Sequence, residues 1–192
     1  MATGRSALVV TVSDRGAAGE REDASGPSVA ARLEGLGFAV ERVVVPDDRT
    51  RIEAALVEGA ARHALVVTTG GTGLTPRDVT PQATRAVIDF EIPGFAEAMR
   101  ADGRARTPMA ILSRAIAGVR GRTLVVNLPG SPRGALESLA VLEPVLAHAL
   151  ETLAGPFEHE SWAERAGGER AGESVGPPDR RRGAGNGPDR AG

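Results

Sequence analysis

Residues 64–81 read ALVVTTGGTGLTPRDVTP, a short apolar run that ends in a glycine-rich polar loop. A short continuous apolar run is typical of a strand that is covered on both faces of a sheet. We therefore predict a buried, central strand at residues 64–68. The loop that follows extends from Thr69 to Thr80. Thr80 and Pro81 should cap and open a helix, because threonine is favoured at N-caps and proline in the first helical turn.

Strand-like and helix-like segments alternate on both sides of this stretch. Apolar runs rich in β-branched residues occur at residues 7–12, 38–45 and 123–128. Helix start signals lie between them, near Pro27, Asp48, Pro93 and Ser131. Such alternation predicts an α/β fold with a mostly parallel sheet.

The chain divides by composition into a domain and a tail. Its 192 residues are enough for one domain with a substantial core, which we expect at residues 1–155. Glycine, proline and arginine are abundant in residues 156–192. Such a composition cannot bury enough apolar surface to offset chain entropy, so we expect this tail to be disordered.

Charge and composition exclude several classes of function. The formal net charge is −2 and the pI is about 6.0, whereas nucleic-acid-binding domains usually have a basic face, so we expect no nucleic-acid partner. There is no cysteine, and all 23 basic residues are arginine, which excludes a disulfide framework and a P-loop lysine. The apolar segment at residues 7–12 is too short for a secretion signal or a membrane span. We expect a soluble cytoplasmic protein with no membrane contact.

Three polar loops should follow the carboxyl ends of the first three predicted strands, where ligands bind in open α/β sheets. The first contains Ser13 and Asp14, the second contains Asp47, and the third is the glycine-rich loop. In the third loop, glycines allow the backbone to approach a ligand closely, so that successive N–H groups can contact phosphate oxygens. The candidate residues there are Thr69, Gly70, Gly71, Thr72 and Gly73. An ordinary glycine-rich turn after a strand remains the alternative.

A second candidate anion site follows the predicted strand at residues 123–128. There a strand end, a tight turn and a helix N-terminus come in succession, and a helix N-terminus offers unpaired N–H groups to a negative charge. The candidate residues are Asn127, Pro129, Gly130 and Ser131. Ordinary turn and capping chemistry is the alternative. Two such loops in one fold suggest a polyphosphate ligand.

Three aspartates, Asp14, Asp47 and Asp78, lie in the loops that a parallel sheet would bring together. Carboxylates beside phosphates usually hold a hard cation such as magnesium. Helix capping or a loop salt bridge is the alternative for each, and we expect Asp48 to cap its helix, which leaves Asp47 free for other contacts. No histidine has a recognisable nucleophile beside it, so hydrolytic triad chemistry is disfavoured.

The chain contains the motifs TVSD at 11–14, TTGGTG at 68–73, RDVTP at 77–81, PGF at 93–95, MR at 99–100, LSR at 112–114 and NLPGSP at 127–132. Taken together, these motifs resemble the MogA/MoaB family over roughly residues 5–155. The order and the spacing of the motifs also match. The glycine loop differs from that usual in the related CinA proteins, and the chain is too short for the additional domains of the MoeA-like molybdotransferases.

The resemblance implies a three-layer α/β/α domain, commonly a homotrimer, that binds molybdopterin and Mg-ATP. The implied reaction is molybdopterin adenylyl transfer: the terminal phosphate of the pterin attacks the α-phosphate of ATP, and pyrophosphate is released. A contact with the downstream molybdotransferase is also implied. By motif, Asp47 and Asp78 are the catalytic residues and magnesium ligands, and Gly70 to Gly73 with Asn127 to Ser131 contact nucleotide and phosphate. The residues implied on the pterin side are Ser13, Asp14, Met99, Arg100 and Ser113.

Two other functions remain open from the sequence. A family member that binds pterin without catalysing transfer would keep the same fold, although the presence of both Asp47 and Asp78 argues against it. A nucleotide-binding interaction module of an unrelated pathway would need only the glycine loop. That second alternative leaves the other motifs unexplained.

Overall fold

The computed structural model describes residues 5–20 and 22–155. The predicted tail at residues 156–192 lies outside the described residues. The strands are β1 (Ser6–Val12), β2 (Ala39–Val45), β3 (Leu65–Thr69), β4 (Phe90–Glu91), β5 (Ala117–Arg120) and β6 (Thr123–Leu128). The helices are α1 (Asp14–Ala17), α2 (Ser25–Gly35), α3 (Arg49–Arg62), α4 (Thr80–Val87), α5 (Pro93–Arg106), the 3-10 helix η1 (Pro108–Leu112) and α6 (Pro132–Ala154).

The strands form one mixed sheet in the order β2-β1-β3-β6-β5-β4. The first four are parallel, whereas β5 runs antiparallel to both β6 and β4. Every residue of β3 is buried, and β3 pairs with β1 on one side and β6 on the other. The prediction of a central, doubly covered strand in a mostly parallel sheet is therefore confirmed.

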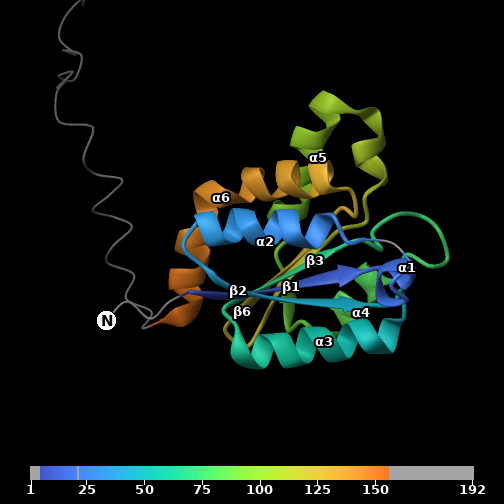
Figure 1. Ribbon diagram of the computed structural model, residues 1–192. Helices are drawn as coiled ribbons and strands as arrows, with labels where there is room; N and C mark the ends of the chain where they lie inside the picture. The colour runs from blue at the N-terminus through green and yellow to red at the C-terminus, as the bar shows by residue number, and fades with distance from the viewer. Residues whose placement is uncertain (1–4, 21, 156–192) are drawn as a thin grey trace, which may run out of the picture. The chain divides into compact units, whose positions relative to one another are not determined.

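Helices cover both faces of the sheet, which gives the three layers visible in Figure 1. One core lies between the strands and α2, α5 and α6, with Val29, Met99 and Leu139 among its buried side chains. The other lies between the strands and α3 and α4, with Ile52 and Leu56 at its centre. The predicted α/β/α sandwich is confirmed, because each face of the sheet has its own apolar core.

The last helix, α6, begins as the sequence predicts. The Ser131 hydroxyl accepts a hydrogen bond from the Gly134 N–H at 3.2 Å, and Pro132 lies in the first turn. Leucines four residues apart, such as Leu142, Leu146 and Leu150, are buried against the sheet. Within residues 5–20 and 22–155, the structure contains no helix whose length and apolar composition would let it cross a bilayer.

The capping role predicted for Thr80 is wrong. Thr80 is the first residue of α4 itself, and Val79 precedes the helix without a side-chain cap. The Thr80 side chain is fully buried and its hydroxyl donates to the Gly70 carbonyl at 2.9 Å. Thr80 therefore ties the end of the loop to its beginning, while Pro81 opens the helix as expected.

Two short strands have no counterpart in the sequence prediction. β4 has only two residues, and β5 contains Gly118, so neither has a readable apolar pattern. β5 joins β6 through the pair Gly121 and Arg122, with Gly121 at a φ of 58°. A positive φ at a two-residue turn suits an antiparallel hairpin, and this hairpin turns the sheet from parallel to mixed.

Candidate functional site

The candidate site lies at the carboxyl edge of the four parallel strands. Within the sheet, β2 lies next to β1 at one edge and β3 lies next to β1 at its other edge. The strand order therefore switches between β1 and β3. Crevices at such a switch point are where ligands bind in open α/β sheets. Hydrogen bonds join the loops there, from Ser13 N–H to the Val45 carbonyl at 2.9 Å and from Gly70 N–H to the Leu128 carbonyl at 3.2 Å.

The two predicted anion sites, the glycine-rich loop after β3 and the turn after β6, pack directly against each other. Gly70 has a φ of 99° and Gly71 a φ of 63°, a region that glycine enters without strain. A Cβ atom on Gly70 would lie 2.4 Å from the Val12 carbonyl oxygen, and one on Gly130 would lie 3.1 Å from the Gly70 Cα. Gly70 is therefore required by close backbone contact as well as by conformation, and a side chain at Gly130 would crowd it.

The first of two cavities at this edge, the glycine-loop cavity, has a volume of about 240 Å³. It is bounded by the ends of β1 and β3 and by the first residues of α2 and α6. Both helices direct the positive end of their dipole toward it, which favours anions, but the first two N–H groups of α2 donate to the Asp23 carboxylate. Of the predicted site residues, it is lined by Ser13, Thr69, Gly70, Gly71 and Gly130.

Asp23 and Ser25 also line the glycine-loop cavity, although the sequence analysis did not select them. The Asp23 carboxylate accepts from the Thr11 hydroxyl at 2.7 Å and from the N–H groups of Ser25 and Gly26 at 3.1 and 2.9 Å. The Ser25 hydroxyl lies 2.9 Å from the Thr69 hydroxyl. An aspartate shortly before a helix beginning is a capping signal, so the pattern could have been read from the sequence.

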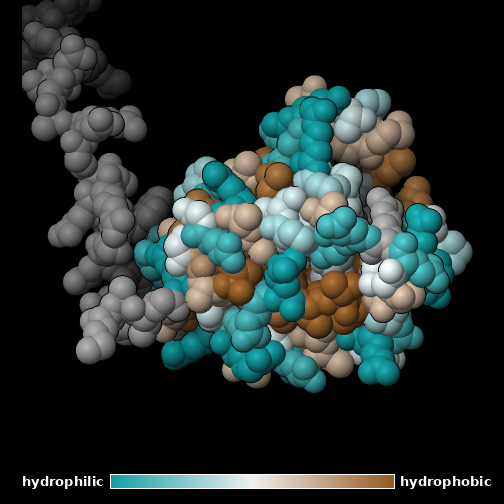
Figure 2. Space-filling view, viewed as in Figure 1, coloured by the Kyte–Doolittle hydropathy of each residue, from teal (hydrophilic) through white to brown (hydrophobic). Residues whose placement is uncertain are grey.

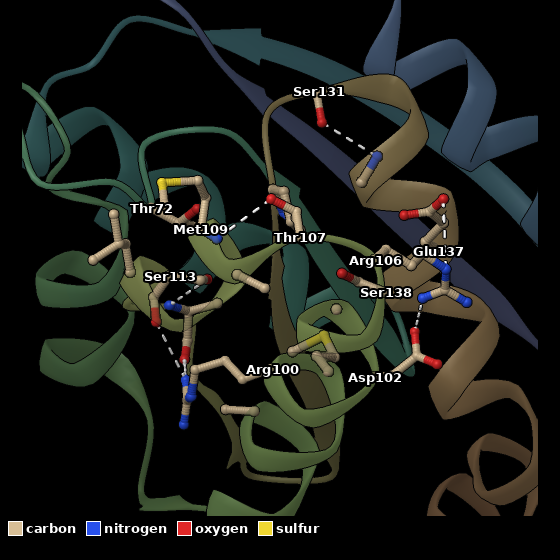
Figure 3. A pocket seen from close by; sticks show the side chains of 18 of the residues that line it. Thr72, Arg100, Asp102, Arg106, Thr107, Met109, Ser113, Ser131, Glu137 and Ser138 are labelled. Atoms are coloured by element: carbon tan, nitrogen blue, oxygen red, sulfur yellow. Dashed lines mark hydrogen bonds and ion pairs between the residues drawn. The ribbon is translucent and has the colours of Figure 1, made fainter.

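The second cavity, the α5–α6 cavity, has a volume of about 320 Å³ and lies between α5, η1 and the start of α6 (Figure 3). Apolar groups such as those of Ala96 and Met99 and several polar side chains form its wall. Of the predicted site residues, it is lined by Thr72, Gly73, Met99, Arg100, Ser113, Pro129 and Ser131. An apolar cavity with a few polar groups is the usual form of a small-molecule site.

A charged network forms the far wall of the α5–α6 cavity and was not predicted. The Arg106 guanidinium lies between Asp102 on its own helix and Glu137 on α6, as Figure 3 shows. The spacing of Asp102 and Arg106 is i, i+4, which was a readable helix signal. The contact with Glu137 depends on the packing of α5 against α6.

The structure separates the residues that the resemblance places on the pterin side. Met99, Arg100 and Ser113 line the α5–α6 cavity, whereas Ser13 lines the glycine-loop cavity. Asp14 lines neither cavity and lies beside Asp47. Arg100 donates to the carbonyls of Ser113 and Ala115 at 3.4 and 3.1 Å, so it ties this segment to α5.

Asp14 and Asp47 are locked in a reciprocal pair. The Asp14 N–H donates to Asp47 Oδ2 at 2.8 Å, and the Asp47 N–H donates to Asp14 Oδ1 at 2.9 Å. The hydrogen bond from Asp47 and the pairing with Arg77 hold the pKa of Asp14 below its usual value. Burial raises the pKa of Asp47, and the negative charges of Asp14 and Asp78 raise it further. Asp48 caps α3 by accepting from Arg51 N–H at 2.9 Å, as predicted.

Asp78 lies at the end of the glycine-rich loop and is itself well held. Its Oδ2 accepts from the Thr75 N–H at 2.8 Å and from the Thr75 hydroxyl at 2.6 Å. Partial burial alone would raise the pKa of Asp78, but the hydrogen bonds from Thr75 and Gly73 and the charge of Arg114 hold it below the usual value. Asp78 is therefore an ionised carboxylate in a fixed loop.

Asn127, predicted as a phosphate contact, lies in the core and makes structural contacts. Its side chain is fully buried and lines neither cavity. The Asn127 amide donates to the hydroxyls of Thr68 at 3.0 Å and Thr84 at 2.8 Å. It thereby joins β6 to β3 and α4, whereas Pro129, Gly130 and Ser131 of the same motif line the two cavities.

Comparison with known proteins identifies the family. Residues 8–148 match the family model described as "Probable molybdopterin binding domain", and the chain belongs to this family. A molybdopterin adenylyltransferase of Helicobacter pylori is 38% identical over 156 residues, covering 78% of this chain and 88% of that protein. A molybdenum cofactor biosynthesis bifunctional protein of Synechococcus elongatus is 41% identical over 151 residues, but the match covers only 47% of it and 78% of this chain.

Solved structures agree with the sequence matches. The molybdopterin biosynthesis enzyme MoaB of Thermus thermophilus is 49% identical, and the match covers 80% of this chain and 99% of that one with a TM-score of 0.74. The resemblance to the MogA/MoaB family read from the sequence is confirmed.

Replacing Asn127 should separate a structural role from a binding role. Asn127→Ala leaves two buried hydroxyls without their amide partner, so the free energy of unfolding should fall by about 2–3 kcal/mol. ATP affinity, measured by calorimetry well below the melting temperature, should be unchanged. Urea unfolding gives the stability, and Thr152→Ala, which removes an exposed hydroxyl on α6, is the control and should change it by no more than about 0.5 kcal/mol. Weaker ATP binding at full stability would restore Asn127 as a ligand contact.

Proposed function

We propose that this protein transfers AMP from Mg-ATP to the terminal phosphate of molybdopterin and releases pyrophosphate, as a molybdopterin adenylyltransferase. One observation carries the proposal: the glycine loop borders both cavities, with Gly70 and Gly71 in one wall and Thr72 and Gly73 in the other. Two ligands that occupy the two cavities would therefore meet at a loop suited to phosphate. The names of the relatives supply the identity of the two ligands.

The nucleotide phosphates are assigned to the glycine-loop cavity. The start of α6 and the backbone of Gly71 offer N–H groups there, and these stabilise negative charge without a lysine. The Gly70 N–H donates to the Leu128 carbonyl instead. The hydroxyls of Ser25 and Thr69 add polar contacts at the same place. Ser13 lines this cavity, so we assign it to the nucleotide phosphates and not to the pterin.

The pterin is assigned to the α5–α6 cavity. Met99 is buried against its wall and offers apolar contact, while Arg100 and Ser113 offer polar groups at its edge (Figure 3). The pterin phosphate would lie at Thr72 and Gly73, next to the nucleotide. This arrangement leaves the rigid α5 and α6 to orient the pterin.

The reaction needs alignment and charge neutralisation more than covalent chemistry. A phosphate oxygen of molybdopterin forms a bond to the α-phosphorus of ATP while the bond from that phosphorus to the bridging oxygen breaks. Pyrophosphate leaves with the electron pair. Backbone N–H groups of the glycine loop and the helix N-termini stabilise the negative charge that develops on the α-phosphate.

Asp47 and Asp78, which line neither cavity, are the residues that we propose to hold a magnesium ion beside the phosphates. Burial raises the pKa of Asp47 and the negative charges of Asp14 and Asp78 add to this effect, so a cation would relieve their repulsion. Within residues 5–20 and 22–155, no three metal-ligating side chains gather at one point, so phosphate oxygens and water would complete the coordination, as is usual for magnesium. The bound ion would supply neutralisation of the phosphate charge.

We also propose that the protein is a homotrimer located in the cytoplasm and that it contacts a molybdotransferase. The family resemblance supports the trimer, and the longer bifunctional relative supports the contact. Exposed apolar side chains are available for association: Figure 2 shows them over β2, where Val43 and Val44 are 37% and 38% exposed. Light scattering at micromolar concentration should give three times the chain mass, and a monomer mass would contradict the trimer.

Incubation with molybdopterin, ATP and magnesium tests the function directly. Adenylylated molybdopterin and pyrophosphate should both accumulate in equal amounts, as measured by mass spectrometry and a pyrophosphate assay. Omission of magnesium, or of either substrate, is the control. Binding of both substrates without any product would instead identify a member of the family that binds pterin but does not transfer AMP.

Asp78→Asn should lower single-turnover adenylyl transfer about a hundredfold, on the order of 3 kcal/mol, because it removes a charge that would act on the metal and phosphates. The melting temperature should change little, since the amide oxygen can still accept from Thr75. Asp48→Asn is the matched control: it makes the same chemical change beside Asp47, and asparagine caps helices as well as aspartate. Near wild-type transfer would remove Asp78 from the mechanism, and a large fall in melting temperature would show a structural role.

A further inference from the structure

The tip of the glycine-rich loop has little packing of its own. Leu74 is 64% exposed, and residues 74–77 are all exposed to solvent. Within the tip, the Asp78 N–H donates to the Thr75 carbonyl at 3.0 Å, and the Asp78 carboxylate accepts the two hydrogen bonds from Thr75. These contacts set the shape of the tip but do not fix the tip to the rest of the domain.

One side chain, that of Arg114, fixes both ends of this tip to the domain. Its Nε donates to the Gly73 carbonyl at 2.6 Å, and its Nη2 donates to the Asp78 carbonyl. The Arg114 backbone N–H also donates to the Thr72 carbonyl at 3.0 Å. Arg114 therefore holds both ends of the segment Gly73 to Asp78, while Arg77 within the segment pairs with Asp14.

Arg114 is in turn held in place from α5. Arg100 donates to the carbonyls of Ser113 and Ala115, the two neighbours of Arg114 in the chain. Ser113 and Arg100 both line the α5–α6 cavity, as Figure 3 shows. The position of the Asp78 loop is thus coupled to the wall of the cavity that we assign to the pterin.

Only a guanidinium group can make these contacts. Its N–H donors have a fixed, planar arrangement, so one group reaches two carbonyl oxygens in a defined geometry. A lysine has a single nitrogen on a flexible stem. Arg114→Lys would keep the positive charge and the backbone hydrogen bond to Thr72, but it would lose the simultaneous hold on Gly73 and Asp78.

We propose that Arg114 is a positioning residue for adenylyl transfer, which places the Asp78 carboxylate by holding the carbonyls of Gly73 and Asp78. The inference rests on the proposed function of Asp78. Arg114 contacts the loop backbone and acts on the reaction through Asp78, so its effect should appear in the rate of transfer more than in substrate binding.

The first test compares Arg114→Lys with Arg120→Lys. Arg120 lies on β5, is also half-buried and also donates to a backbone carbonyl, that of Val87 at 2.6 Å, so it is a matched control away from the site. Arg114→Lys should lower kcat at least about tenfold with little change in the KM of ATP or molybdopterin, since small displacements of a catalytic group lower the rate strongly. Arg120→Lys should leave kcat unchanged. Equal kcat values, or a far larger fall in melting temperature for Arg114→Lys, would overturn the proposal.

A double-variant cycle asks whether Arg114 acts through Asp78. If it does, adding Arg114→Lys to Asp78→Asn should lower the transfer rate no further, because the group that Arg114 positions is already inactive. If the two residues acted independently, the double variant should lose a further factor of about ten. A further loss of this size would contradict the proposed positioning role.

Amide hydrogen exchange tests the positioning without any substrate. Exchange of the Thr75 and Asp78 N–H groups should be faster in Arg114→Lys than in wild type, and unchanged in Arg120→Lys. Unchanged exchange in Arg114→Lys would overturn the inference whatever the activity. If the wild type fails to form adenylylated molybdopterin but exchange responds as expected, the proposed function fails, while the hold of Arg114 on the Asp78 loop stands.

Discussion

The close backbone packing at Gly70 is the constraint on which the site depends. The end of β1 and the turn after β6 both approach Gly70 so closely that Cβ atoms at Gly70 or Gly130 would clash or crowd the backbone. This packing brings the two anion loops into contact. It also makes the glycine loop a common wall, with residues 70 and 71 facing one cavity and residues 72 and 73 facing the other.

A buried polar network fixes the strand ends and the helix start from which these two loops extend, so the loops can pack against each other. The Asn127 amide joins the hydroxyls of Thr68 and Thr84, and the Thr80 hydroxyl returns to the Gly70 carbonyl. Each of these four side chains has a defined partner, and such networks specify one arrangement. The loop therefore leaves and re-enters the domain at set points before any ligand binds, which favours catalysis by alignment.

Arginine supplies the positive charge around the site, because the chain contains no lysine. Arg77 pairs with Asp14, Arg100 holds the segment around Ser113, and Arg114 holds the ends of the Asp78 loop. These arginines are occupied as supports, so our proposal assigns the phosphate contacts to backbone N–H groups and helix N-termini. Such an anion site would need no P-loop lysine.

The sequence by itself determined the α/β architecture, the central strand, the glycine loop, the caps at Asp48 and Ser131 and the family. These features rest on apolar periodicity, capping residues and motifs that are local in the chain. Only the tertiary structure decided that Asn127 is buried, that Asp14 and Asp47 pair across 33 residues, and that Met99 and Ser13 line different cavities. The two short strands β4 and β5 also escaped prediction, because pairing with neighbouring strands defines them more than their own residues do. Burial and hydrogen-bond partners of this kind depend on contacts between distant segments, which no local pattern specifies.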